Sequence, residues 1–146
     1  MQLTSKGRYA VMAMADLSAA GCVARAVPIA EIAARQGLSA AYLEQLFARL
    51  RRAGLVEGVR GPGGGYRLAQ PARDVSVAQV IAAVDERIAT TRCEPGSRIG
   101  CTGKTERCVT HDLWAALNCK INEFLAGISL QDVADGRVSV AKALAP

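Results

Sequence analysis

The chain has 146 residues, of which 51% are hydrophobic and 21% charged, and its formal net charge is +5. This length suits one domain, or a small domain with an extension, and so high an apolar fraction excludes a disordered chain. No apolar run reaches the roughly 18 residues of a membrane helix, and the opening residues MQLTSKGRYAVMAMADLSAAG lack the layout of a secretory signal. We therefore expect a cytoplasmic protein that does not bind membranes.

The net positive charge is confined to the first half of the chain. Residues 1–74 contain ten Lys or Arg and five acidic residues, whereas residues 75–146 contain eight of each. Such a separation is expected if the first half meets a polyanion, although an idle basic surface would look the same.

The first half has the pattern of a helix-turn-helix. A helix is expected from Thr4 to before Gly21, and a short second helix, PIAEIAARQG, begins near Pro28 and ends at Gly37. A third helix restarts with Ser39 as its cap and carries an inward apolar stripe of Leu43, Leu46, Phe47 and Leu50. Only the residues GLS separate the second and third helices, which is the length of the tight turn in DNA-binding proteins of this kind.

The outward face of the third helix offers groups that bind DNA. Gln45 can pair with an adenine edge, Arg49 can bind guanine or phosphate, and Ser39 and Tyr42 can donate to phosphate oxygens. Glu44 is the one acidic residue there, and it can accept from a cytosine amino group while repelling phosphate. A solvated helix face is an equally good interpretation of these residues taken alone.

The next segment, GLVEGVRGPGGGYRLAQ, predicts a β-hairpin and favours the DNA-binding interpretation. Two short strands flank a tip without side-chain bulk, so the backbone at Gly63 and Gly64 can approach a phosphate chain or a narrow groove. Arg60 and Arg67 border that tip, and arginine is drawn to the negative potential of the minor groove. A helix-turn-helix followed by a basic hairpin is typical of a winged helix. We assign residues 1–75 to this domain.

The remaining residues, 76–146, predict a ligand loop between helices. A helix capped by Ser76 precedes the polar loop 91–111, and a long helix that Thr110 can cap follows it. The long helix carries an apolar stripe of Leu113, Trp114, Leu117, Ile121, Phe124, Leu125 and Ile128. Because the winged helix is large enough to close its own core, we expect this stripe to pair with a second copy of the chain, and a short further helix to follow within SLQDVADG.

The polar loop gathers three of the five cysteines and the only histidine. Cys93, Cys101, Cys108 and His111 are donors suited to zinc or to an iron–sulfur cluster, since both accept thiolate and imidazole ligands. The spacing lacks the tight Cys pair common at zinc sites, and this favours a cluster without excluding zinc. Cys22 and Cys119 fall outside the pattern, and we expect them to be inert.

The stretches LTSKGRYAVMAM, RQGLSAAYLEQLF, GLVEGVRGPGGGYRLA, VDE, TRC and CVTHDLW together resemble the IscR family, bacterial iron–sulfur cluster regulators among the Rrf-type winged-helix repressors. The resemblance implies a homodimeric transcription factor that binds a palindromic double-stranded operator and a 2Fe–2S cluster held by Cys93, Cys101, Cys108 and His111. It also implies that Ser39, Tyr42 and Gln45 contact the major groove and Arg60 the minor groove. Members of this family repress their own cluster-assembly operon when the cluster is present.

Other functions remain to be separated from this one. A nitric-oxide or redox-sensing regulator of the same fold, a zinc-stabilised DNA-binding protein and an iron–sulfur carrier all use part of the same features, although a carrier would have no need of the basic first half. An enzyme acting on a small-molecule substrate is not expected, because the only histidine belongs to the ligand set and no nucleophile–base arrangement is present.

Overall fold

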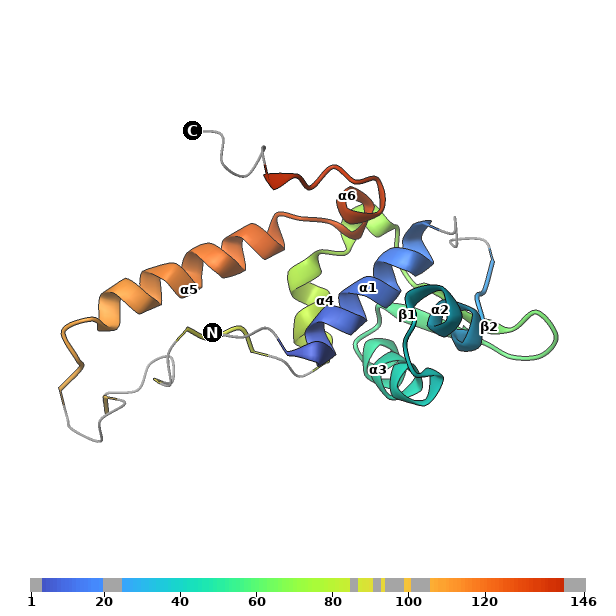
Figure 1. The fold of residues 1–146 in the computed structure, drawn as a ribbon, viewed down its shortest axis with the longest axis horizontal. Coiled ribbons are helices and arrows are strands. Elements are labelled where there is room, and N and C mark those ends of the chain that lie inside the picture. Colours follow the sequence, from blue (N-terminus) through green and yellow to red (C-terminus); the bar gives the residue numbers. More distant parts are fainter. Residues whose placement is uncertain are drawn as a thin grey trace.

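The computed structural model describes residues 4–19, 25–84, 87–90, 93, 99–100 and 106–140. The elements follow in the order α1 (Ser5–Ala19), α2 (Ile29–Gln36), α3 (Ala40–Arg52), β1 (Val56–Val59), β2 (Gly65–Leu68), the 3-10 turn η1 (Ala72–Asp74), α4 (Val77–Ala83), α5 (His111–Ala126) and α6 (Leu130–Ala134). Helices predominate and a single hairpin forms the described sheet (Figure 1). The expected fold class, mainly α with a small β-hairpin wing, is confirmed.

The hydrophobic core is built around α1, which packs against α2, α3, α4 and α6. Ala10 and Ala13 are fully buried, and their small side chains let neighbouring helices approach α1 closely. The predicted inward stripe of α3 is confirmed, with Leu43, Leu46, Phe47 and Leu50 all buried. Each large side chain buried in this way contributes about 1.5–3 kcal/mol, so packing fixes the orientation of α3.

The turn between α2 and α3 forms as the sequence predicts. Gly37 ends α2 in the left-handed conformation, at φ 65°, and its amide donates to the Ala33 carbonyl. Ser39 caps α3, because its side-chain oxygen accepts from the Tyr42 amide at 3.3 Å. Glycine tolerates the positive φ and serine satisfies a free helix amide, so two local choices set a three-residue turn.

The wing is an antiparallel hairpin whose register runs from Val56 opposite Leu68 to Val59 opposite Gly65. Both predicted strands are confirmed. The tip between them turns at Gly61 and Gly63, which adopt φ values of 93° and 73°. In Figure 1 the tip projects at one end of the molecule, and α5 extends toward the other.

The core continues past the expected boundary at residue 75. Val80 and Val84 of the α4 region and Leu130 of α6 are fully buried in the same cluster as α1 and α3. Backbone hydrogen bonds from Val77 to Ile128 and from Leu130 to Val75, both 2.9 Å long, join the start of α4 to the start of α6. The second half of the chain therefore supplies part of the core of the first.

Helix α5 differs from the other helices because none of its sixteen residues is buried. It extends away from the helices around α1 and packs against α4 (Figure 1). Thr110 occupies the cap position, but its side chain makes no capping hydrogen bond and lies 3.6 Å from the Cys108 thiol instead. The expected capping by the Thr110 hydroxyl is thus wrong, because the neighbouring sulfur engages that hydroxyl.

In the described part of the chain, no helix combines the length and apolar character needed to cross a membrane. Cys22, Cys101 and much of the loop 91–111 lie outside the described residues.

Candidate DNA interface and metal centre

The outer face of α3 presents the predicted side chains to different degrees. Glu44 and Gln45 are exposed, and Ser39 is exposed at the helix start. Tyr42 is half-buried and packs edge-to-face on Tyr9 of α1, with ring centroids 6.1 Å apart. The contact with Tyr9 thus holds the Tyr42 ring in one orientation. The Ser39 hydroxyl accepts from the Tyr42 amide and can still donate its own proton.

Arg49 lies differently from the other residues of this face. Its Nη1 donates to the Val84 carbonyl at 3.2 Å, and the side chain is half-buried. Val84 is the C-cap residue directly after α4. The long side chain therefore reaches from α3 to the end of α4, a contact that helical periodicity cannot reveal.

The two arginines of the wing also differ from each other. Arg67 forms an ion pair with Glu57 on the opposite strand, with Nη2 and Nε both 3.0 Å from Oε2. Arg60 is exposed at the end of β1, next to the tip. Arg60 is thus solvent-exposed beside the tip, whereas the guanidinium of Arg67 already has a carboxylate partner.

The glycines of the wing serve two purposes. Gly63 has open space around it, so its backbone is accessible at the tip, as expected. A Cβ on Gly64 would lie 2.5 Å from the Val59 carbonyl oxygen, and one on Gly65 would lie 2.2 Å from the Val27 carbonyl oxygen. Gly64 and Gly65 are therefore required by close packing within the protein itself.

The close packing at Gly65 belongs to a contact that the sequence analysis missed. Val27 pairs with Tyr66 as an antiparallel bridge, with two backbone hydrogen bonds of 2.8 Å. The Tyr66 ring packs on Phe47 of α3 at a centroid distance of 5.0 Å. The position of Val27 directly before Pro28 was the available signal, since proline favours an extended preceding residue. The wing is therefore attached both to the segment before α2 and to α3.

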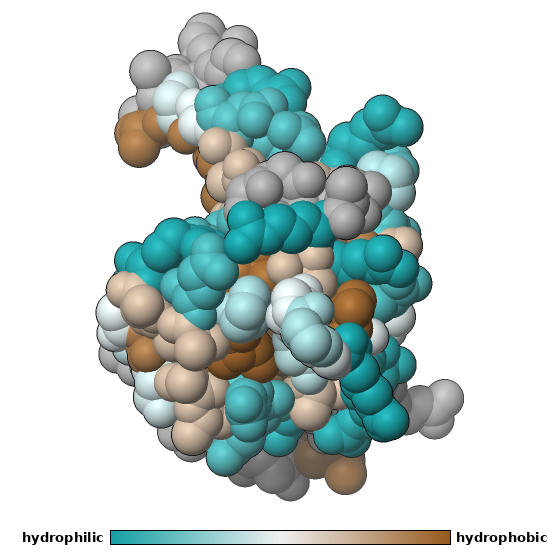
Figure 2. Space-filling model, turned by 90° about the vertical axis from the view of Figure 1, so that its right-hand side faces the viewer, coloured by the Kyte–Doolittle hydropathy of each residue, from teal (hydrophilic) through white to brown (hydrophobic). Residues whose placement is uncertain are grey.

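A groove runs between the wing and the two helices of the helix-turn-helix. Its lining residues come from the start of α2, from α3 and from the base of the wing: Pro28, Ile29, Ala30, Glu44, Gly64, Gly65 and Tyr66. Figure 2 shows the side of the molecule on which the wing lies, where hydrophilic residues surround smaller apolar patches. Glu44 is the only charged residue in the lining, so a ligand entering the groove meets a carboxylate.

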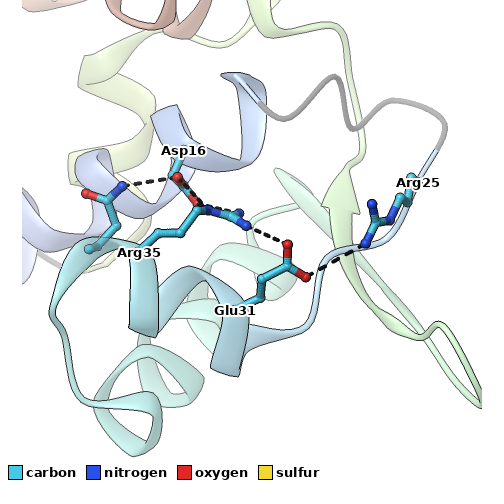
Figure 3. Close-up of polar contacts among 5 residues, drawn as sticks. Asp16, Arg25, Glu31 and Arg35 are labelled. Carbon is cyan, nitrogen blue, oxygen red and sulfur yellow. Dashed lines mark hydrogen bonds and ion pairs between the residues drawn. The ribbon is translucent and has the colours of Figure 1, made fainter.

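A polar network attaches α2 to α1 on the same half of the molecule (Figure 3). The Arg35 guanidinium donates three hydrogen bonds to the Asp16 carboxylate, at 2.8–3.2 Å, and another to Glu31 at 2.6 Å. Gln36 adds a hydrogen bond to Asp16 at 3.1 Å, and Arg25 lies 3.8 Å from Glu31. The hydrogen bond to Asp16 is the main reason that the pKa of Arg35 is raised further above its usual value. The network holds the end of α2 where the turn to α3 begins.

The candidate metal centre lies where the polar loop enters α5. The His111 amide donates to the Cys108 carbonyl at 3.0 Å, so the two predicted ligands share one turn. His111 Nδ1 is buried and has no hydrogen-bond partner, although buried polar atoms are normally paired. Cys93 and Cys108 are half-buried and form no disulfide among the described residues, and Cys101 lies outside them. Within the described residues, Cys93 is not gathered with Cys108 and His111 into a group that could hold a metal. The compatibility with an iron–sulfur cluster therefore rests on the unpaired imidazole nitrogen of His111 and on the turn that it shares with Cys108.

The apolar stripe of α5 is largely solvent-exposed in the single chain. The exposed fractions are 61% for Leu113, 40% for Trp114, 39% for Leu117 and 49% for Phe124. Cys119 lies on another face, where its thiol donates to Glu123 at 3.4 Å. The hydrogen bond and the negative charge of Glu123 raise the pKa of the Cys119 thiol. A raised pKa leaves less reactive thiolate, in agreement with the expected inertness of this cysteine.

The sequence and the fold both match known regulators. The profile of the Rrf2 family, described as iron-dependent transcriptional regulators, matches residues 3–136. The HTH-type transcriptional regulator IscR of Vibrio atlanticus is 54% identical over 133 residues, which cover 91% of this chain and 75% of that protein. The IscR of Photorhabdus laumondii is 53% identical over 137 residues, covering 94% and 81%.

Two solved structures show the same fold. The structure of T. potens IscR is 36% identical with a TM-score of 0.74, covering 100% of this chain and 93% of that one. CymR, the global cysteine regulator of B. subtilis, is 27% identical with a TM-score of 0.77, covering 92% and 97%.

Proposed function

Because the chain belongs to the Rrf2 family of transcriptional regulators, we propose that it is a cytoplasmic, homodimeric and non-enzymatic repressor whose affinity for its operator depends on a bound 2Fe–2S cluster. The observation that carries the cluster assignment is the buried, unpaired Nδ1 of His111 in the same turn as Cys108. The names of the IscR relatives support the same choice over zinc. The operon that assembles iron–sulfur clusters is the proposed target.

The four proposed ligands are Cys93, Cys101, Cys108 and His111. When bound, the cluster supplies a centre that forms only where iron and sulfide are available and that changes charge on oxidation or reduction. His111 is the first residue of α5, Cys108 lies in the turn directly before it, and Cys93 belongs to the segment between α4 and α5. Cluster binding therefore joins α4 to α5.

DNA contact is proposed for α3 and the wing. Ser39, Tyr42 and Gln45 are placed to meet phosphates and base edges in a major groove, while Arg60 reaches the adjacent minor groove. Glu44, in its groove beside the wing, discriminates between operators, because a carboxylate without a donor opposite it is repelled by phosphate. The backbone at Gly63 allows the tip to approach the DNA closely.

Dimerisation is proposed through α5. Its stripe exposes several large apolar side chains, and an exposed apolar surface of this kind marks an interaction site. A symmetric pair of α5 helices would place two winged helices for the two halves of a palindrome.

The test starts with protein purified without oxygen, measured for visible absorption and for iron, sulfide and zinc. A 2Fe–2S spectrum with equal iron and sulfide is expected, and zinc without sulfide would contradict the cluster. His111→Ala is expected to give a labile or poorly occupied cluster.

Operator affinity is then measured on palindromic DNA selected from a random pool by the wild-type protein. Equal affinity of the cluster-loaded and cluster-free proteins would contradict the sensing role.

A further inference from the structure

The outer face of the wing carries one ion pair, between Glu57 on β1 and Arg67 on β2. The two residues lie directly opposite each other in the antiparallel register, next to the buried pair of Val56 and Leu68. Because successive side chains of a strand point to opposite faces, Glu57 and Arg67 lie on the face away from the core. Their side chains are 52% and 42% exposed. The pair is therefore open to solvent and to a ligand that approaches the wing from this face.

The contact occupies one edge of the Arg67 guanidinium. Its Nε and Nη2 both lie 3.0 Å from Glu57 Oε2, so one carboxylate oxygen faces both nitrogens. Arg60, on the other side of the tip, has no carboxylate partner within the described residues. The wing thus carries one arginine whose charge is offset by a neighbour and one whose charge is not.

Arg67 lies at the height where a phosphate chain would pass if the wing enters a minor groove. A strand rises about 3.3 Å per residue, so Arg67 lies roughly 7 Å along β2 from Gly65, where the strand leaves the tip. The minor groove is about 7.5 Å deep, and the two phosphate chains form its rims. When the tip is near the base edges, Arg67 is therefore close to the level of those phosphates.

The carboxylate of Glu57 changes what a phosphate would experience at this point. Coulomb energy is inversely proportional to distance, so a phosphate about 4 Å from the guanidinium and roughly 7 Å from the carboxylate is repelled more than half as strongly as it is attracted. An exposed ion pair stabilises a fold by little. The larger effect of Glu57 is therefore to cancel the charge of Arg67.

Resting on the proposed function, we propose that Glu57 limits sequence-independent binding to DNA by neutralising Arg67 on the wing. Each Lys or Arg that neutralises a phosphate makes binding more salt-dependent, with a slope of about −0.9 per contact in log affinity against log salt concentration. Arg67 contributes no such contact in the wild-type protein, because Glu57 already offsets its charge. Removal of the carboxylate makes the guanidinium available to a phosphate of DNA of any sequence.

The test compares the full wild-type chain with Glu57→Gln, which keeps the shape of the side chain but removes its charge. Affinity is measured for the operator selected by the wild-type protein and for a random-sequence duplex of equal length. Between about 50 and 200 mM salt, the affinity of Glu57→Gln is expected to fall about three- to fourfold further than that of wild type, on both duplexes. An equal salt dependence would overturn the proposal.

Two other outcomes of this comparison would also overturn the proposal. A weaker salt dependence in Glu57→Gln would show that the carboxylate directs Arg67 toward a phosphate. A change confined to the operator would show a base contact, because phosphate contacts carry no sequence information.

Two controls separate the role of Arg67 from a change in net charge. Asp74→Asn removes an exposed carboxylate that lies beside Arg73 in η1, and it adds the same charge away from the tip. Its salt dependence should equal that of wild type. The double variant Glu57→Gln/Arg67→Gln should also return to the wild-type salt dependence, because the available guanidinium is gone. An Asp74→Asn protein as salt-dependent as Glu57→Gln, or a double variant that stays more salt-dependent than wild type, would refute the role of Arg67.

The outcome for the wild-type protein distinguishes this proposal from the proposed function. Wild-type protein that binds neither duplex would contradict the proposed function, and the role of Glu57 falls with it. Selective operator binding by wild type, together with an unchanged salt dependence in Glu57→Gln, would overturn the Glu57 proposal alone. Glu57→Gln should unfold at nearly the wild-type temperature, since the ion pair is exposed.

Discussion

Arg60 and Arg67 stand on either side of the same glycine-rich tip, yet their surroundings make them unequal. Arg67 shares its guanidinium with Glu57 across the hairpin, whereas Arg60 is exposed at the end of β1. A surface ion pair stabilises by little, but it directs the Arg67 side chain along the sheet. The sequence treats the two residues alike, and only the cross-strand register that places Glu57 opposite Arg67 distinguishes them.

Arg60→Ala is expected to weaken operator binding by about 1–3 kcal/mol if the side chain reads a base edge. The slope of log affinity against log salt concentration should fall by about one if it contacts phosphate instead. Titration of labelled operator at several salt concentrations measures both. Arg73→Ala is the matched control, because Arg73 is also an exposed arginine but lies in the 3-10 turn η1, away from the tip of the wing. Equal affinity of the wild-type and Arg60→Ala proteins would remove Arg60 from the interface.

Arg49→Ala is expected to weaken operator binding without changing the salt slope, because the Arg49 guanidinium bonds to the Val84 carbonyl and acts by holding α3 against the end of α4. The same titrations measure the slope. Arg49→Lys, which keeps the charge but loses the planar fork, should behave like Arg49→Ala. A slope reduced by about one would instead show a phosphate contact, as the sequence alone suggested.

At the scale of the element, the wing is packed against the rest of the domain and is not a freely projecting hairpin. Val27 pairs with Tyr66, and Tyr66 packs on Phe47 of α3. A shift of α3 therefore moves the wing with it. This coupling sets the distance between the parts proposed to enter the major and minor grooves.

Gly65→Ala is expected to destabilise the protein and to abolish high-affinity operator binding. Its φ of 147° is rare for residues with a side chain, and the added Cβ would lie 2.2 Å from the Val27 carbonyl oxygen. Backbone strain alone costs on the order of 1–3 kcal/mol, and the clash adds to it. Thermal unfolding and operator titration measure the two effects.

Gly136→Ala is the control for Gly65→Ala. Gly136 also has a positive φ, of 64°, but a Cβ there would meet no atom within 4 Å. The Gly136→Ala substitution should lower the unfolding temperature modestly and leave operator affinity unchanged. Equal losses of stability in the two variants would show that the contact with Val27 does not matter.

The elements that the sequence predicted well are those fixed by local chemistry. The turn at Gly37, the caps at Ser39 and Ser76 and the apolar stripe of α3 each depend on residues within one or two helical turns. The bridge from Val27 to Tyr66 joins residues far apart in the sequence and uses only backbone atoms. Pro28 indicated that Val27 is extended, but nothing in the sequence identified Tyr66 as its partner. Thr110 had the right residue type and position for a cap, but its hydroxyl contacts the Cys108 thiol and not a backbone amide of α5.

At the scale of the whole molecule, the single chain leaves α5 without a partner for its apolar face. The stripe was predictable because its residues recur at helical spacing. That it stays exposed also follows from the structure of the core, which is filled by α1, α4 and α6. The ligand set was predicted from residue type alone. The structure adds the turn that joins Cys108 to His111, and within the described residues it does not gather Cys93 with them.

Leu117→Asp is expected to convert a dimer into a monomer, because it places a charge in the middle of the stripe on α5. Sedimentation velocity at micromolar concentration measures the change, with the wild-type protein remaining dimeric even without metal. Cys119→Asp is the matched control, because successive helical residues are about 100° apart and position 119 therefore lies on nearly the opposite face. A metal-free wild-type protein that sediments as a monomer, or a dimeric Leu117→Asp, would contradict this interface.

Leu130 has a consequence for how the chain is made. This residue is fully buried among side chains of α1, so the core cannot be completed on the ribosome until residue 130 has left the exit tunnel. At typical synthesis rates roughly 3–11 s separate the translation of residues 75 and 130, and during that interval the nascent helix-turn-helix and wing wait for their last core helix. By then α5 has already been synthesised, so each new chain completes its core after the helix proposed to bind a second copy has been made.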